Sequence, residues 1–182
     1  MADSLLMHGA DAVAADAARS QREALFSNAL REDGPALLRL AAAYTNSEGD
    51  RDDLFQEIAC AIWQALPAFR GGCSVRTYVF RIAHNRGISH LAGKKPVAMV
   101  YQEDLRLHDP MPNPERRLEL EEQRRNMIAA VRKLPLVYRQ VIMLALEGMS
   151  YPEIAEILGV TESNVGIRLT RARKALRKIL EL

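Results

Sequence analysis

The sequence has few of the residues and segments that mark disulfide-bonded, secreted or membrane proteins. It contains two cysteines, Cys60 and Cys73, which form no CxxC pair and no series of metal ligands, so we expect a reduced, intracellular chain. No run of about 18 apolar residues occurs, and a membrane-spanning helix is therefore not expected. The N-terminal segment has no basic start and no long apolar stretch, so it is not expected to be a signal peptide. The resulting prediction is a cytoplasmic protein.

Histidine is also scarce. The sequence offers His8, His84, His90 and His108, and none of them forms a pair with a nucleophile or an HExxH motif. A metal site built from Cys73, His84 and His90 is the least favoured interpretation. We therefore predict a protein without catalytic activity, metal or other cofactor.

Aromatic residues make up only 5% of the chain, whereas apolar residues make up 48%, with Leu, Ala, Ile, Arg and Glu prominent. This composition favours helices over strands, and the expected fold class is all-α. The formal net charge is only +2, so total charge does not identify a partner. The distribution of charge along the chain has to do so.

Helical periodicity divides the chain into two modules. It begins near residue 20, with a break expected at Gly34-Pro35, and it fails where four prolines fall within residues 96–114. It then returns and continues to the end, with breaks at Leu134-Pro135 and Gly148. We predict two small helical domains on a flexible linker. The expected segments are a disordered lead-in (1–19), a first domain (20–95), an acidic linker (96–114) and a second domain (115–182).

An acidic cluster stands at the start of a helix expected from about Arg51 to Leu66. Acids at a helix N-terminus stabilise the helix dipole, which is one sufficient explanation of the cluster. Asp53, Gln56 and Glu57 also form a polar ridge suited to a basic partner surface. Both interpretations stay open from the residues alone.

The next helix is expected to begin at Ser74, its N-cap, and to run to about Leu91. Three-to-four spacing places Tyr78, Arg81 and Asn85 on one face of this helix, behind a Gly-rich loop. An ordinary amphipathic helix would explain the pattern. An aromatic and polar ridge of this kind can also stack on unpaired bases and form hydrogen bonds with them.

The spacing from Ser150 onward is typical of a helix-turn-helix. Ser150 and Glu153 form an S-x-x-E capping box, and Gly159 supplies the turn. Thr161 is expected to cap the second helix, and an ordinary αα-hairpin is the alternative. Small or apolar residues complete the corner and the inner stripe of the second helix: Ala155, Val165, Leu169, Ala172 and Leu176.

The second helix of this pair has two kinds of outward-facing residue. Those near its start are placed to read base edges in a major groove: Ser163, Asn164, Ile167 and Arg168. A basic run without interspersed acids follows, which favours phosphate neutralisation over a merely solvated face. Its members are Arg171, Arg173, Lys174, Arg177 and Lys178.

Three stretches together resemble the extracytoplasmic-function (ECF) group of bacterial sigma factors. They are "DDLFQEIACAIWQALPAFRGG", "RTYVFRIAHN" and "LPLVYRQVIMLALEGMSYPEIAEILGVTESNVGIRLTRARKAL", in the order of the family and spanning about residues 20–182. The resemblance implies domains like sigma regions 2 and 4. It also implies that the chain binds core RNA polymerase, at the β′ clamp helices and the β flap, and directs it to promoter DNA.

The resemblance also implies roles for individual residues. Asp53, Gln56 and Glu57 are expected to dock on the clamp helices, and Asn85 is expected to receive a flipped-out base of the −10 element. The −10 surface further includes Ser74, Tyr78 and Arg81. The helix from Glu162 is expected to read the −35 element with Ser163, Asn164, Ile167, Arg168 and Arg171. The acidic connector toward the polymerase active site would carry Glu103, Asp104 and Asp109.

The chain departs from the family at several positions. Tyr78 stands where the family usually has Trp, Ser89 where it has Asp, and Ala92 where it has Arg. These changes bear on promoter sequence and on the strength of duplex melting. The alternatives are a plain helix-turn-helix repressor, which would typically form dimers, and a sigma-like decoy that sequesters an anti-sigma factor. We expect a protein that is monomeric when free and controlled by an anti-sigma factor.

Overall fold

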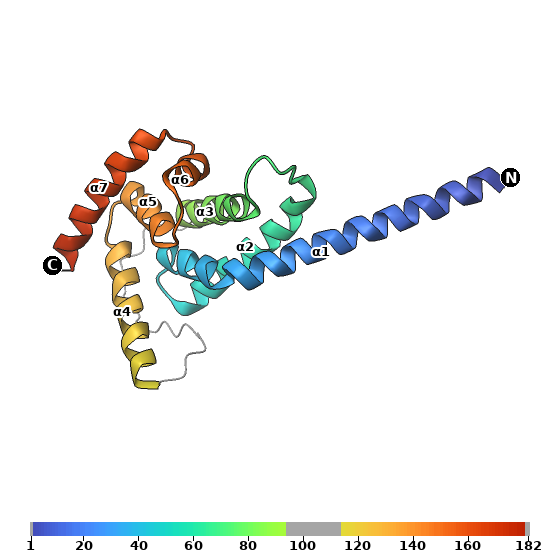
Figure 1. The fold of residues 1–182 in the computed structure, drawn as a ribbon. Helices are drawn as coiled ribbons and strands as arrows, with labels where there is room; N and C mark the ends of the chain where they lie inside the picture. Colours follow the sequence, from blue (N-terminus) through green and yellow to red (C-terminus); the bar gives the residue numbers. More distant parts are fainter. Residues whose placement is uncertain (1, 94–113, 181–182) are drawn as a thin grey trace.

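The computed structural model describes residues 2–93 and 114–180, and every regular element in these ranges is helical (Figure 1). The expected all-α class is thereby confirmed. The first group of elements is α1 (Ala2–Tyr44), α2 (Glu48–Ala65), the short 3₁₀ helix η1 (Leu66–Ala68) and α3 (Val75–Gly93). The second group is α4 (Pro114–Arg132), α5 (Leu136–Leu146), α6 (Tyr151–Leu158) and α7 (Glu162–Ile179).

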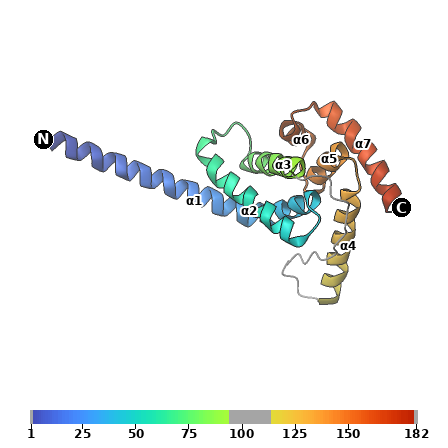
Figure 2. The same cartoon turned by 180° about the vertical axis from the view of Figure 1, so that it is seen from behind.

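Helix α1 is continuous through both places where the sequence predicts otherwise. It includes residues 2–19, for which a disordered lead-in is expected, and it does not break at Gly34-Pro35. Proline removes a helical hydrogen bond at a cost of about 3 kcal/mol. Here the Pro35 ring faces solvent while Ala36, Leu37 and Leu40 are buried on the opposite side. Packing of these neighbours offsets the local cost, and the first part of α1 projects away from the body (Figures 1 and 2).

Helices α1, α2 and α3 pack into the first bundle. Helix α2 begins three residues before the expected Arg51 because the Ser47 side chain caps it, accepting a hydrogen bond from the Asp50 amide at 3.2 Å. The core includes Leu37, Leu54, Ile58, Ile62 and Phe80, all without exposed surface.

A polar pair lies inside this first bundle. The Tyr44 hydroxyl and His84 Nδ1 are 3.0 Å apart, and burial lowers the pKa of His84 to about 4. Gly87 leaves room for the tyrosine ring, since a Cβ at this position would lie 2.5 Å from Tyr44 Cδ2. His84 is therefore a neutral core residue that aligns α1 with α3.

The second bundle forms as its sequence predicts. Both hydrogen bonds of the Ser150–Glu153 capping box are present, and Gly159 ends α6 in the left-handed region with φ +64°. The Thr161 side chain caps α7 by accepting from the Asn164 amide at 3.3 Å. Four residues of the expected inner stripe are buried: Val165, Leu169, Ala172 and Leu176.

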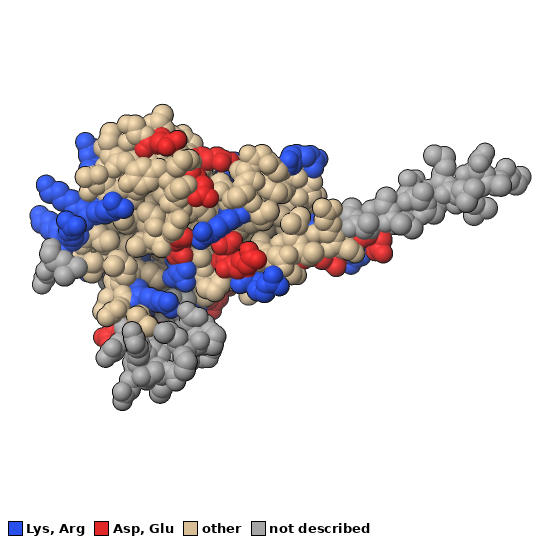
Figure 3. Space-filling model, in the orientation of Figure 1, with Lys and Arg blue, Asp and Glu red and all other residues tan. Residues whose placement is uncertain are grey.

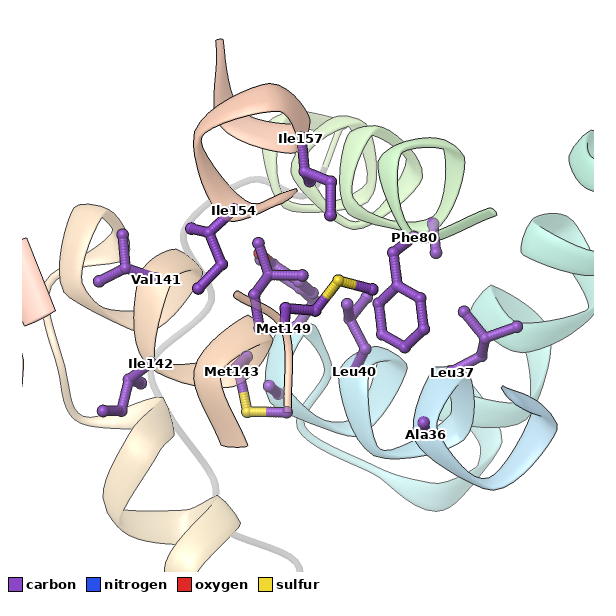
Figure 4. Close-up of a cluster of buried hydrophobic side chains, with 14 of the residues drawn as sticks. Ala36, Leu37, Leu40, Phe80, Val141, Ile142, Met143, Met149, Ile154 and Ile157 are labelled. Atoms are coloured by element: carbon purple, nitrogen blue, oxygen red, sulfur yellow. The ribbon is translucent and has the colours of Figure 1, made fainter. Parts of the chain in front are cut away.

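The two bundles share one hydrophobic cluster instead of standing apart on a tether. In Figure 4, Met149 of the α5–α6 turn lies beside Leu40 of α1, and Phe80 of α3 borders the same cluster. Helix α6 packs on α3, and α4 and α5 pack on α1. The part of the predicted linker that joins α3 to α4 falls on residues 94–113, outside the described residues.

A polar contact at the edge of this shared core joins the bundles. Arg39 of α1 donates from Nε and Nη2 to the two carboxylate oxygens of Glu147, at 2.8 and 2.5 Å. The Glu147 side chain is only 6% exposed. Arg76 of α3 donates to the backbone carbonyl of Glu147 at 2.7 Å and pairs with Asp33 at 2.9 Å. The end of α5 is thus held from both α1 and α3.

Replacement of Glu147 should therefore weaken the contact between the bundles. Glu147→Gln removes the charge that compensates Arg39, and we expect a loss of about 1–3 kcal/mol in the free energy of unfolding, measured by urea denaturation. A double-mutant cycle with Arg39→Gln should give a coupling energy above about 0.5 kcal/mol. Glu32→Gln is the matched control, because the Arg31–Glu32 pair is 3.9 Å apart and more than 70% exposed on both sides. Additive effects of the Arg39 and Glu147 changes would contradict this account.

Candidate protein and nucleic-acid interfaces

The polar ridge of α2 faces solvent. Asp53, Gln56 and Glu57 are all exposed, while Leu54 and Ile58 on the other side of the helix are buried. This exposure is what contact with a partner surface requires. Neither ridge carboxylate forms an ion pair within the described part of the chain, so both are available to an external cation.

The neighbouring acids of α2 have structural tasks. Asp52 accepts a hydrogen bond from Arg51 Nε at 2.8 Å, and Glu48 lies 3.5 Å from the same guanidinium. The Arg51 side chain is only 8% exposed. The sequence pattern alone does not separate these acids from Asp53, because all of them fall in the same turn and a half of helix.

The three expected residues of α3 do lie along one face, and two of them are in contact. The guanidinium of Arg81 lies over the Tyr78 ring, with 5.4 Å from its carbon to the ring centroid. The Tyr78 hydroxyl donates to the Ala65 carbonyl at 3.0 Å, which fixes the ring. Asn85 lies one turn further along and is exposed. This face offers a ring, a cation and a free amide, which are groups that can stack on a base and bond to its edge.

Ser74 has a different position from the other expected −10 residues. Its hydroxyl oxygen accepts from the Thr77 amide at 2.9 Å and lies 2.8 Å from the Thr77 hydroxyl. It therefore caps the start of α3, as its sequence position predicts.

Helix α6 of the second bundle covers part of the α3 face. Arg81 Nη1 lies 3.3 Å from a carboxylate oxygen of Glu156, and the Thr77 hydroxyl donates to Glu153 at 3.4 Å. Hydrogen bonds from Ser150 lower the pKa of Glu153, so its carboxylate is ionised here. A nucleic acid that reaches Arg81 has to displace Glu156. The sequence gives no sign of this contact, because it depends on how the two bundles pack.

The start of α7 presents the residues expected to read bases. Ser163, Asn164 and Ile167 are exposed, and Arg168 is partly buried. The Ile167 side chain is 53% exposed. An apolar side chain at that position in a helix-turn-helix can contact a thymine methyl group in the major groove.

Gly166 is not required by packing inside the protein. A Cβ at this position would lie 3.6 Å from Tyr151 Cε2, which is an ordinary van der Waals distance. The Gly166 carbonyl accepts from the Thr170 hydroxyl at 2.9 Å. A glycine inside a helix costs about 1 kcal/mol relative to alanine, and nothing in the surrounding structure explains its presence here.

The basic run of α7 forms one face, seen as the concentration of blue near the C-terminal end of the molecule (Figure 3). Its residues are exposed and form no ion pair within the described ranges. Leu169, Ala172 and Leu176 are buried on the opposite side. Four basic residues also line a shallow hollow beside Thr170: Arg173, Lys174, Arg177 and Lys178. Uncompensated cations on one helix face suit the phosphates of a duplex.

The described residues contain no group of three His, Cys, Asp or Glu side chains that could hold a metal ion. No described helix has the length and apolar character needed to cross a membrane. The acidic connector residues Glu103, Asp104 and Asp109 lie outside the described residues.

Comparisons with known proteins agree with this arrangement. The family model described as Sigma-70 region 2 matches residues 30–96, and the model described as Sigma-70, region 4 matches residues 124–176. The RNA polymerase sigma factor NccH of Alcaligenes xylosoxydans xylosoxydans is 32% identical over 181 residues, covering 94% of each chain. The ECF RNA polymerase sigma-E factor of Escherichia coli K12 is 33% identical over 147 residues, covering 75% of this chain and 76% of the relative.

Solved structures show the same fold. CnrH, in complex with the cytosolic domain of CnrY, is 29% identical with a TM-score of 0.65, covering 92% of this chain and 94% of CnrH. The sigma factor RpoE, in complex with the anti-sigma factor NepR from Bartonella quintana, has a TM-score of 0.64 at 22% identity, covering 86% and 97%. With both region models matched in order and a sigma factor 32% identical across 94% of its length, the chain belongs to the ECF group of RNA polymerase sigma factors.

Proposed function

We propose that this sigma factor divides its task among the three surfaces described above. The α2 ridge of Asp53, Gln56 and Glu57 docks on the β′ clamp helices, the α3 face around Asn85 binds the −10 element, and α7 reads the −35 element. The observation that carries this assignment is the separation of the three surfaces. The two that suit nucleic acid lie on different bundles, and the acidic ridge of α2 forms no ion pair within the described residues. One chain can then contact polymerase and two promoter elements, without catalytic chemistry of its own and in the cytoplasm.

We also propose control by an anti-sigma protein. CnrH was solved with the cytosolic domain of CnrY, and RpoE was solved with NepR. The packing of α6 on α3 supports such control, because a partner that favours this packing keeps Glu156 on Arg81. A repressor would have no use for the α2 ridge. A decoy would have no use for the uncompensated cations of α7.

The docking assignment predicts that charge reversal on α2 abolishes polymerase binding. Asp53→Lys combined with Glu57→Lys replaces attraction to a basic surface by repulsion, while the helix keeps its buried side. Binding to core polymerase and run-off transcription from promoters selected from a random library should both be lost. Asp16→Lys combined with Glu32→Lys, at two exposed acids of α1, changes the net charge by the same amount and is the control. The assignment fails if the double variant binds core polymerase as well as the parent does.

The −10 assignment predicts that Asn85→Ala reduces promoter melting without affecting the −35 contact. The amide offers a paired donor and acceptor to an unstacked base, and alanine offers neither. Permanganate footprinting of the holoenzyme should show fewer reactive thymines at the −10 element. Arg86→Ala, at the exposed neighbouring position, is the control. Equal melting by the Asn85 variant and the parent would remove Asn85 from the site.

The −35 assignment predicts different effects at the two ends of α7. Arg168→Ala should cost about 1–3 kcal/mol on the preferred sequence and relax discrimination, because a guanidinium can bond to a guanine edge with two donors. Arg177→Ala should weaken binding to all duplexes equally and reduce the salt dependence by about one counterion. Fluorescence-anisotropy titrations with matched and scrambled duplexes at several salt concentrations measure both effects. Uniform loss of affinity in both variants would show that Arg168 is another phosphate contact.

A further inference from the structure

A hollow of about 280 Å³ lies where α1 of the first bundle meets α4 and α5 of the second. Its polar lining consists of Arg39 from α1, Arg124 from α4 and Glu147 from the end of α5. None of the three surfaces in the proposed function includes this hollow. Its apolar lining comes entirely from the second bundle: Met127, Ile128, Val131, Met143 and Leu146.

The apolar lining combines buried and exposed side chains. Ile128, Val131 and Met143 are at most 4% exposed, whereas Leu146 is 49% exposed. A ligand that covers Leu146 removes this apolar surface from water, which favours binding. Met127 and Met143 have unbranched side chains, and such side chains adapt to irregular shapes. The hollow therefore suits an apolar chain.

The polar side of the hollow favours an anion. Two guanidinium groups line it against one carboxylate, and that carboxylate accepts hydrogen bonds from Arg39 at 2.8 and 2.5 Å. The Arg39 side chain is 26% exposed, so its guanidinium is within reach of a ligand. A guanidinium carries five N–H donors and can bond to more than one carboxylate. Its planar fork matches a carboxylate with two parallel hydrogen bonds.

We propose that this hollow binds a medium-chain aliphatic carboxylate, with the chain against Met127 and Met143 and the head group on Arg39 and Arg124. The volume lies just below the range of roughly 300–1,000 Å³ typical of small-molecule sites, so the hollow holds one short chain. A helical peptide would need a longer groove, because its anchoring side chains are spread over several turns. An amphiphile with a neutral or cationic head lacks the charge that the guanidinium groups recognise.

A ligand in this hollow stabilises the packing of the two bundles on each other. Arg39 belongs to the first bundle and the rest of the lining to the second, so separation of the bundles takes the site apart. A ligand that binds only the packed form shifts the equilibrium toward it. This step rests on the proposed function, in which Arg81 has to leave Glu156 before the α3 face binds the −10 element. The bound carboxylate therefore opposes assembly with core polymerase.

Calorimetric titration of the full chain with hexanoate, octanoate and decanoate tests the site. Each added methylene should lower Kd by up to about fourfold while the chain is being buried, and the gain should cease once the hollow is full. Octanol and octylamine are the head-group controls, and each should bind at least about tenfold more weakly than octanoate. Equal affinity for the three carboxylates, or binding of octanol as tightly as octanoate, would overturn the proposal.

Substitutions on α4 separate the head-group contact from the space in the hollow. Arg124→Gln should weaken octanoate binding by about tenfold and leave octanol unaffected. Met127→Trp, at a partly buried position, fills the hollow and should abolish binding of all three carboxylates. Arg125→Gln is the matched control, because Arg125 neighbours Arg124 but does not line the hollow. Duplex binding through α7 shows that each variant is folded, and a folded Met127→Trp that binds octanoate as the parent does would refute the site.

Competition with core polymerase tests the coupling to the proposed function. Octanoate at about ten times its Kd should weaken binding of the parent to core polymerase by about tenfold, and Met127→Trp should be insensitive to it. Octanoate binding without any change in core affinity would overturn the coupling. The proposed function is tested separately by the parent without ligand. If that protein fails to direct transcription while octanoate still binds with the expected dependence on chain length, the site stands and the promoter assignment falls.

Discussion

The contact of Glu147 with Arg39 fixes the position of the second bundle, and the other surfaces depend on it. Glu147 ends α5, and Gly148 follows with φ +76°, a left-handed conformation that turns the chain sharply toward α6. Glu147 and Met149, on either side of this glycine, both contact the first bundle. A nearly buried carboxylate is stable only when its charge is compensated. The pair with Arg39 and the bond from Arg76 therefore hold the turn in one place.

This placement decides which candidate surfaces are open. Helix α6 rests on α3, so Glu153 and Glu156 occupy the edge of the face that carries Tyr78 and Arg81. The α2 ridge and the outer face of α7 remain exposed. In this arrangement an acid of the second bundle, Glu156, pairs with Arg81 on the proposed −10 surface of the first. The basic run of α7, which forms no ion pair within the described residues, keeps its positive charge.

Local elements could be predicted from the sequence because their signals are local. The Ser150–Glu153 capping box, the Thr161 cap and the α7 stripe follow from residues a few positions apart, and all are present. The helix break predicted at Pro35 does not occur, because burial of the residues on the other side of α1 offsets the free-energy cost of a proline inside a helix. The hydrogen bond between Arg39 and Glu147 joins residues 108 positions apart, and no periodic pattern in the sequence indicates it. The assigned roles of Asn85 and Arg168 depend on partners that a single chain does not display.

The two bundles are held together by apolar packing more than by the ion pair between Arg81 and Glu156. Arg81 and Glu156 are 36% and 42% exposed, and pairs of that kind contribute about 0–1 kcal/mol. Met149, Ile154 and Ile157 are at most 5% exposed and share one cluster with Leu40 and Phe80. Each fully buried side chain of this size is worth about 1.5–3 kcal/mol. Salt alone should therefore loosen the α6 contact without separating the bundles. A protein that separates the two bundles has to bury this apolar surface against apolar side chains of its own.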